Sequence, residues 1–174
     1  LIYKRGHYIG LHPSYDSFHS LKKVKTEFLN LQNTLKKLKI NQINNFNRMH
    51  YLKWRWPMTP NILQKIGINE DSTLGFPDLN GFRCGTSHSF KMFDPVVKKE
   101  LNLIQKPLIV MDSSLINDSF IDLNKENKII KNVKKLYFQT KKYGGFFTIL
   151  WHNDSLRTKK QKDLYYKIIK MLVS

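Results

Sequence analysis

Titratable and cationic side chains follow short apolar segments at several places in this sequence. His12, Asp112 and His152 each come directly after such a segment, and Arg48 and His50 lie in a further extended stretch. Each residue taken alone is compatible with a turn or capping role. Together, histidine and aspartate are the side chains used to hold metal ions and to transfer protons. The coincidence predicts one shared active site, provided that the fold brings these segment ends together.

The spacing of His12 and Asp16, four residues apart, indicates a metal site. If the turn after the apolar segment winds like a helix, both side chains can reach one ion, because residues four apart lie on the same helix face. A plain turn or helix-start role for Asp16 remains the alternative.

The sequence excludes several other kinds of site. Its one cysteine, Cys84, allows neither a disulfide framework nor a cysteine-based zinc cluster. No glycine-rich phosphate loop joins a predicted strand to a helix, and no serine occupies a Gly-x-Ser-x-Gly turn. The longest apolar stretch, 146–151, is too short to span a bilayer.

The elements that must position these residues alternate between strand and helix. Predicted strands cover 7–11, 107–111 and 146–151, with an extended segment at 45–54. Predicted helices, from apolar spacings of three and four, cover about 20–38, 59–66, 124–143 (with Asn124 as cap) and 158–172. This order indicates an α/β fold with a parallel sheet covered by helices, open or closed into a barrel. Ligands bind at the carboxyl ends of such strands. With 174 residues, we expect one domain over 1–174.

The chain is strongly basic, with a formal net charge of +17. Of the 30 basic residues 25 are lysines, which read bases and grip phosphates less specifically than arginines. The lysines fall on the polar faces of the predicted helices, where solvation explains them, although attraction to an acidic polymer or a membrane surface is an alternative. The charge alone therefore assigns no function, and a nucleic-acid partner is not expected.

Three short motifs occur in order at residues 6–12, 48–51 and 150–152. They resemble the second, third and last motifs of the polysaccharide deacetylases, the NodB-homology carbohydrate esterases. The linking segments 67–76, 81–86 and 111–115 are similar to those of a subgroup associated with surface-polysaccharide genes. The likeness extends from one end of the chain to the other.

The resemblance implies a hydrolase that uses a divalent metal ion, with zinc expected, to remove N-acetyl groups from a polysaccharide or sugar. It implies a partial (β/α) barrel-like fold of the NodB type, with helices covering a mostly parallel sheet. His12 would bind the metal, and Asp16 would replace the second histidine of that motif. Arg48 would hold the catalytic base, and His152 would act as general acid.

The predicted substrate-binding residues are Arg83, Tyr51 and Asp112. Tyr51 would stack on a sugar ring. The alternatives are loop bracing for Arg83, and either orienting His152 or capping the following turn for Asp112.

Two departures from the family pattern accompany this likeness. The first motif, which carries two aspartates including the base, has no counterpart here, so we expect a domain that lacks its first strand or strands and is inactive alone. The replacement of a histidine by Asp16 favours a non-catalytic glycan-binding relative as the rival function, while the charge favours a nucleic-acid-binding module. The subgroup resemblance implies a cytoplasmic location.

Overall fold

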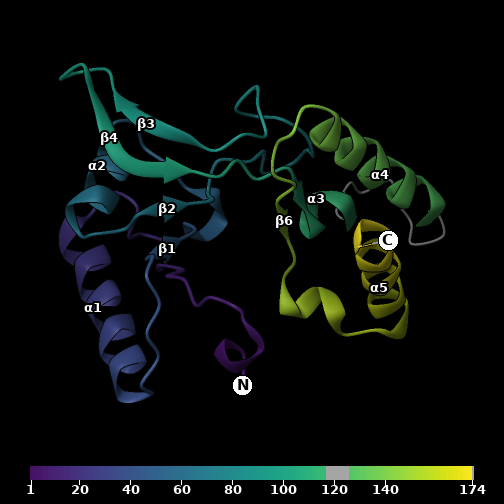
Figure 1. Cartoon of the computed structure of the whole chain (residues 1–174), viewed down its shortest axis with the longest axis horizontal. Coiled ribbons are helices and arrows are strands. Elements are labelled where there is room, and N and C mark those ends of the chain that lie inside the picture. Colours follow the sequence, from purple (N-terminus) through teal and green to yellow (C-terminus); the bar gives the residue numbers. More distant parts are fainter. Residues whose placement is uncertain (117–125, 174) are drawn as a thin grey trace. The chain divides into compact units, whose positions relative to one another are not determined.

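The computed structural model describes residues 1–116 and 126–173 and shows an α/β protein (Figure 1). The chain divides into two compact units, one made of Leu1–Leu74 and Ser89–Lys106, the other of Gly75–His88 and Pro107–Ser174. Each unit has its own hydrophobic core. The α/β prediction is confirmed, while the prediction of one domain over 1–174 stays a prediction.

The first unit is built on a four-stranded sheet in the order β1-β2-β4-β3. β1, β2 and β4 run parallel, and β3 is antiparallel to β4. The mostly parallel sheet expected from the sequence is therefore present. The strands are β1 (Phe46–Asn47), β2 (Glu70–Asp71), β3 (Phe90–Asp94) and β4 (Lys99–Gln105).

The predicted strand 7–11 is reduced to a single bridge. Leu11 pairs in parallel with Asn47, and its backbone N–H donates to the Phe46 carbonyl at 2.8 Å. The backbone N–H and C=O of Ile9 instead bond to the side-chain amide of Gln42, at 3.1 and 2.7 Å. A side chain thus satisfies the polar groups that a neighbouring strand would otherwise pair.

Two helices complete this unit: α1 (Leu21–Lys37) and α2 (Met58–Lys65). Ser20 caps α1 by accepting a hydrogen bond from the Lys23 N–H. The apolar face of α1 buries Val24, Phe28 and Leu35, as its spacing predicts. A 3₁₀ turn, η2 (His50–Leu52), follows β1.

The hairpin of β3 and β4 is not among the elements expected from the sequence. Met92 and Asp94 are buried on β3, whereas Lys91 and Phe93 between and beside them are exposed. Strand β3 therefore buries one polar residue, Asp94, and exposes one apolar residue, Phe93. Its sequence consequently lacks the apolar–polar alternation by which a half-buried strand is recognised.

Among its described residues, the second unit holds a two-stranded parallel sheet and three α-helices. Its α4 and α5 are joined by an ion pair between Glu126 and Lys167 at 2.6 Å. The expected cap of α4, Asn124, lies outside the described residues. The elements are β5 (Val110–Met111), α3 (Asp112–Ile116), α4 (Glu126–Lys142), β6 (Ile149–Leu150), a 3₁₀ turn η4 (Asn153–Leu156) and α5 (Lys159–Val173).

The strands in the described residues form these two sheets, with no closed barrel among them. Within the same part of the chain, no helix is both long enough and apolar enough to cross a membrane.

Candidate functional site

The carboxyl ends of neighbouring parallel segments bring two histidines together in the first unit. His12 follows the bridging residue Leu11, and His50 lies just beyond β1. His12 Nε2 and His50 Nδ1 are 2.9 Å apart, and the two rings meet edge to face with centroids 4.9 Å apart. Within this unit, polar groups from two segment ends do gather as the sequence predicts.

The hydrogen bonds assign the tautomers of this histidine pair. His12 Nδ1 lies 2.7 Å from the backbone oxygen of Arg48, which can only accept, so Nδ1 carries the hydrogen. A neutral His12 therefore has its lone pair on Nε2. The Nδ1–H of His50 must then donate to it. This arrangement leaves His50 Nε2 as an acceptor.

The pair could offer two nitrogen donors to a divalent metal ion only after the hydrogen bond between the two rings is broken, because the lone pair of His12 Nε2 accepts from His50 in this geometry. A histidine whose second nitrogen donates to a backbone carbonyl is oriented as metal-binding histidines usually are. A catalytic zinc ion, however, takes three protein ligands as a rule. The described residues contain no group of three or more His, Cys, Asp or Glu side chains able to hold an ion. The donor set therefore does not complete a catalytic metal site.

The helical geometry assumed for His12 and Asp16 is wrong. Ser17 N–H donates to the Ser14 carbonyl at 3.0 Å, and Ser20 N–H donates to the Ser17 carbonyl at 2.8 Å. These bonds make two tight turns before α1 rather than a continuous helical turn. The spacing of four consequently does not put the two side chains on one helix face, and a ligand role for Asp16 stays a prediction.

Arg48 lies beside the histidine pair and is anchored to the next strand segment. Its Nε donates to both the backbone oxygen and the hydroxyl of Ser72, each at 3.1 Å. Burial lowers the pKa of the Arg48 guanidinium from its ordinary value, while the charge of nearby Asp71 works in the opposite direction. Arg48 is therefore held in one orientation close to a buried carboxyl group.

Asp71 is the buried centre of the hydrogen-bond network under this site. It accepts from Asn47 Nδ2, from Thr73 N–H and from the Thr73 hydroxyl, each at 2.7 Å. The Thr73 hydroxyl in turn accepts from Met49 N–H at 2.9 Å. Burial raises the pKa of Asp71, although these bonds and Arg48 favour its charged form. Through Met49, the network fixes the segment that carries Arg48 and His50.

An aromatic rim borders His50. Tyr51 is 72% exposed and has a φ of 55°, a left-handed conformation that few non-glycine residues adopt. Its ring lies 4.7 Å from that of His50 and 5.3 Å from that of Tyr15. Lys53 Nζ lies 3.4 Å from the centroid of the Tyr15 ring. The rim offers an exposed aromatic face beside the histidine pair.

The second unit contains a separate aspartate–histidine pair at the carboxyl ends of β5 and β6. His152 Nδ1 lies 2.6 Å from Asp112 Oδ1, and the His152 backbone N–H donates to Oδ2 at 2.8 Å. Asp112 also accepts from Ser113 N–H at 2.8 Å. This carboxylate gives the His152 ring one orientation and places the hydrogen on Nδ1, leaving Nε2 free to exchange a proton.

Asp112 and Arg83, the other two residues predicted to bind substrate, make contacts that match their alternative roles. The Asp112 side chain is fully buried, with its oxygens against His152 and Ser113, so its observed contacts match the alternative role of orienting His152. Arg83 donates from Nη1 to the Gly75 carbonyl at 2.7 Å, which matches its loop-bracing alternative. Substrate binding by either residue stays a prediction.

The sequence reasoning missed two residues that the structure brings into the site. The sequence places His50 at a segment end without indicating a role for it, and it does not point to Asp71 as a site residue. The signal that could have identified Asp71 is the position of polar residues along the strands. Asn47, Asp71 and Gln105 are polar residues in register on neighbouring strands, where a buried sheet is normally apolar.

Fold and site together define an α/β protein with a histidine pair in one unit and an aspartate–histidine pair in the other. Comparisons with models of known protein families, with curated proteins and with solved structures found no match.

Proposed function

We propose that this chain is part of a polysaccharide deacetylase-like domain, with a partial (β/α) barrel-like fold, that hydrolyses N-acetyl groups on a polysaccharide or sugar. The observation that carries the proposal is the His12–His50 pair at the carboxyl ends of parallel segments. The Arg48 carbonyl behind His12 gives that ring the orientation of a ligand, and His12 Nε2 would exchange its hydrogen bond from His50 Nδ1, 2.9 Å away, for the ion.

The reaction requires a proton donor, and His152 suits that role. Hydrolysis adds water to the acetyl carbonyl carbon and breaks the C–N bond, giving acetate and an amine. The departing nitrogen must gain a proton as the bond breaks. His152 would deliver it from Nε2, because Asp112 occupies Nδ1 at 2.6 Å. Asp112 is thus a positioning residue in this proposal.

Arg48 and Tyr51 have supporting roles. The resemblance assigns Arg48 to holding the catalytic carboxylate, and its bonds to Ser72 orient the guanidinium for such a partner. Tyr51 offers the exposed ring that would stack on the sugar. Divalent metal ions supply Lewis-acid chemistry when bound. Since the described donors do not complete a site, we derive no step through an ion.

The non-catalytic glycan-binding relative is the second candidate, and the incomplete donor set favours it. Such a protein would keep the exposed aromatic rim and bind sugar without turnover.

Zinc titration by calorimetry tests the metal part of the proposal. Binding of one zinc ion that His12→Ala and His50→Ala each weaken at least about tenfold would support the proposal, because each variant removes a nitrogen donor, whereas the two histidines alone predict no tight site. His19→Ala, which changes another exposed histidine, should leave binding unchanged. Asp16→Ala reports directly on whether Asp16 is a ligand. Equal zinc binding by the parent and both histidine variants would refute the metal role.

Acetate release from a chitin-type oligosaccharide separates the two candidates. The assay is made on the protein in its full reading frame, because the aspartate motif of the family has no counterpart in these 174 residues. Deacetylation that is lost in His152→Ala supports the enzyme. Sugar binding with no acetate from the zinc-loaded protein would instead identify the glycan-binding relative.

A further inference from the structure

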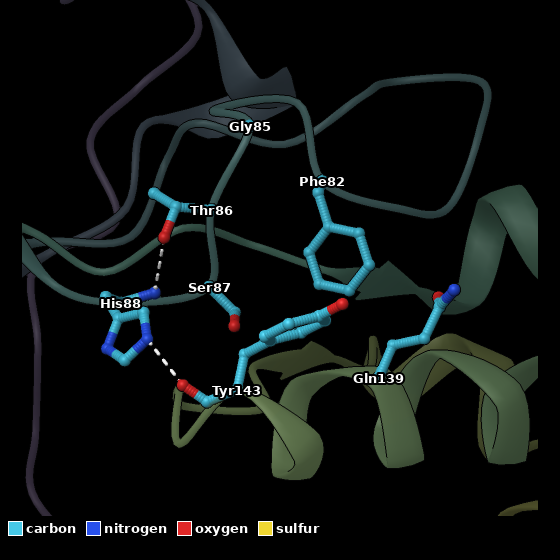
Figure 2. A pocket seen from close by; sticks show the side chains of 7 residues that line it. All are labelled: Phe82, Gly85, Thr86, Ser87, His88, Gln139 and Tyr143. Carbon is cyan, nitrogen blue, oxygen red and sulfur yellow. Dashed lines mark hydrogen bonds between the residues drawn. The ribbon is translucent and has the colours of Figure 1, made fainter.

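A cavity of about 510 Å³ lies in the second unit, between the loop 82–88 and the last turns of α4 (Figure 2). Its volume falls in the range of small-molecule sites, which is roughly 300–1,000 Å³. The described residues that line it belong to this unit, and the proposed reaction uses none of these residues.

The walls of this cavity are held by direct contacts between the loop and the end of α4. His88 Nε2 lies 2.7 Å from the Tyr143 carbonyl, and Phe146 N–H donates to the Ser87 carbonyl at 3.0 Å. A Cβ added to Gly145 would lie 2.0 Å from Ser87 Oγ, so the two segments touch where only glycine fits. The cavity is therefore part of the folded unit.

Aromatic rings and neutral hydrogen-bonding groups line the cavity. Figure 2 shows the Phe82 ring above that of Tyr143, with the Ser87 hydroxyl and the Gln139 amide on opposite sides of the Tyr143 ring. None of the described residues lining it is Asp, Glu, Lys or Arg. His88 adds a ring whose Nε2–H is taken by the Tyr143 carbonyl, which leaves Nδ1 as an acceptor.

This lining suits a sugar ring better than an ion. The two aromatic rings offer apolar surface to the C–H face of a pyranose, and the hydroxyl and amide groups can both donate and accept, as sugar hydroxyls require. An acetamido group would place its methyl against Phe82 and its amide near that of Gln139. A phosphate or carboxylate would find no arginine or lysine among the described residues of the lining.

The cavity lies at the opposite end of β6 from the Asp112–His152 pair. Tyr143 and Gly145 precede β6 in the chain, at its amino end, whereas His152 follows its carboxyl end. Because β5 and β6 are parallel, Asp112 and His152 share the carboxyl end. A ligand in this cavity would therefore bind apart from the proton donor.

We propose that this cavity is an accessory site for one N-acetylated hexose residue of a polymeric substrate. The choice of an N-acetylated sugar rests on the proposed function, whereas the aromatic and polar lining is independent of it. Such a site would hold the polymer by a second attachment and raise its effective concentration near the protein.

The test is a titration of the isotope-labelled chain with the N-acetylglucosamine trimer, followed by amide NMR shifts. We expect saturable shifts at Ser87, His88 and Tyr143. Tyr143→Ala should raise the dissociation constant about two- to tenfold, since it removes one aromatic wall. Gln139→Ala should weaken binding of the N-acetylglucosamine trimer more than binding of the glucose trimer, which lacks the acetamido group. Tyr166→Ala is the matched control, because Tyr166 on α5 is 66% exposed, close to the 67% of Tyr143.

Each outcome decides the proposal. Absence of saturable shifts at the three amides, equal binding by Tyr143→Ala, or preference for a mononucleotide over the trimer would overturn it. Shifts confined to the surroundings of His12 and Tyr51 would refute the accessory site while leaving the proposed function intact. Binding in the cavity by a protein that neither binds zinc nor releases acetate would refute the proposed enzyme and keep the site as a sugar-binding one.

Discussion

Replacement of Asp71 tests whether the network beneath the histidine pair is the structural support of the site. Asp71→Ala removes the acceptor of three hydrogen bonds and leaves Asn47 Nδ2, Thr73 N–H and the Thr73 hydroxyl buried without it. Each such bond contributes about 1–1.5 kcal/mol, or about 3–4.5 kcal/mol for the three. Removing a buried carboxylate recovers part of its desolvation cost. We therefore expect a loss of about 2–4 kcal/mol in the free energy of unfolding.

Asp71→Asn is the discriminating comparison. The amide oxygen of the new Asn can accept from Thr73 N–H. Its Nδ2 can donate to Asn47 Oδ1 if the Asn47 side-chain amide rotates so that its oxygen and nitrogen exchange places. This rotation gives a partner to Asn47 Oδ1, which is buried without one among the described residues, and leaves Asn47 Nδ2 unpaired in its place. The bond donated by the Thr73 hydroxyl is also lost, so the expected cost is about 1–2 kcal/mol, below that of Asp71→Ala.

The pH dependence adds a second readout. Burial raises the pKa of Asp71 above the unfolded value of about 3.9, so between the two values the native state holds more protons than the unfolded chain. Over that window the contribution of Asp71 to stability falls as the pH rises. Asn does not titrate, so the cost of Asp71→Asn should shrink from acidic to neutral pH.

The assay is urea unfolding followed by tryptophan fluorescence. Trp54 packs against the core of the first unit and Trp151 against that of the second, so a Trp151→Phe background isolates the first. Asp16→Asn, an exposed carboxylate in the same unit, is the control. Equal stability of the parent and Asp71→Ala, or equal losses in the Ala and Asn variants, would contradict the network argument.

Three further changes probe the second unit. Gly145→Ala should lower its thermal stability by about 1–3 kcal/mol, because the added Cβ lies 2.0 Å from Ser87 Oγ, and Ser87→Gly should restore part of the loss. Ile129→Ala, at a fully buried position of α4, should cost about 2–5 kcal/mol by circular dichroism; a cost below 1 kcal/mol would mean that α4 is not packed as described. Asp112→Ala should increase ring motion of His152 in NMR relaxation, since the ring loses its acceptor; unchanged ring motion would show that other contacts hold it.

Four of the five α-helices in the described residues were predictable, largely because their apolar spacing is regular, whereas α3 (Asp112–Ile116) was not expected. The predicted helix 20–38 corresponds to α1 (Leu21–Lys37), and 158–172 corresponds to α5 (Lys159–Val173). In both, the buried residues belong to the set that repeats every three or four positions. The strands were harder to predict, because each parallel strand except β4 is only two residues long. In addition, a side chain can replace strand pairing, as that of Gln42 does at Ile9.

The candidate site was predictable in position but not in its pairings. The sequence predicts that His12, Arg48 and His152 lie at the ends of strands, and the structure places them just after a bridge residue or a strand, while their roles stay predictions. The sequence could not show that His12 meets His50, because that contact joins residues 38 apart in the chain and depends on the register of Leu11 with Asn47. The Asp112–His152 contact, 40 residues apart, was only one of two alternatives for the same reason.

The buried polar residues at the carboxyl ends of the sheet connect these findings. Asn47, Asp71 and Gln105 lie in register on three neighbouring strands and are at most 3% exposed. Asn47 Oδ1 and Gln105 Oε1 have no hydrogen-bond partner among the described residues. Apolar side chains there would stabilise the unit more, since a buried polar group without a partner costs about 1–3 kcal/mol. We infer that this edge of the sheet is organised to position Arg48 and His50, at some expense of stability, as functional sites often are.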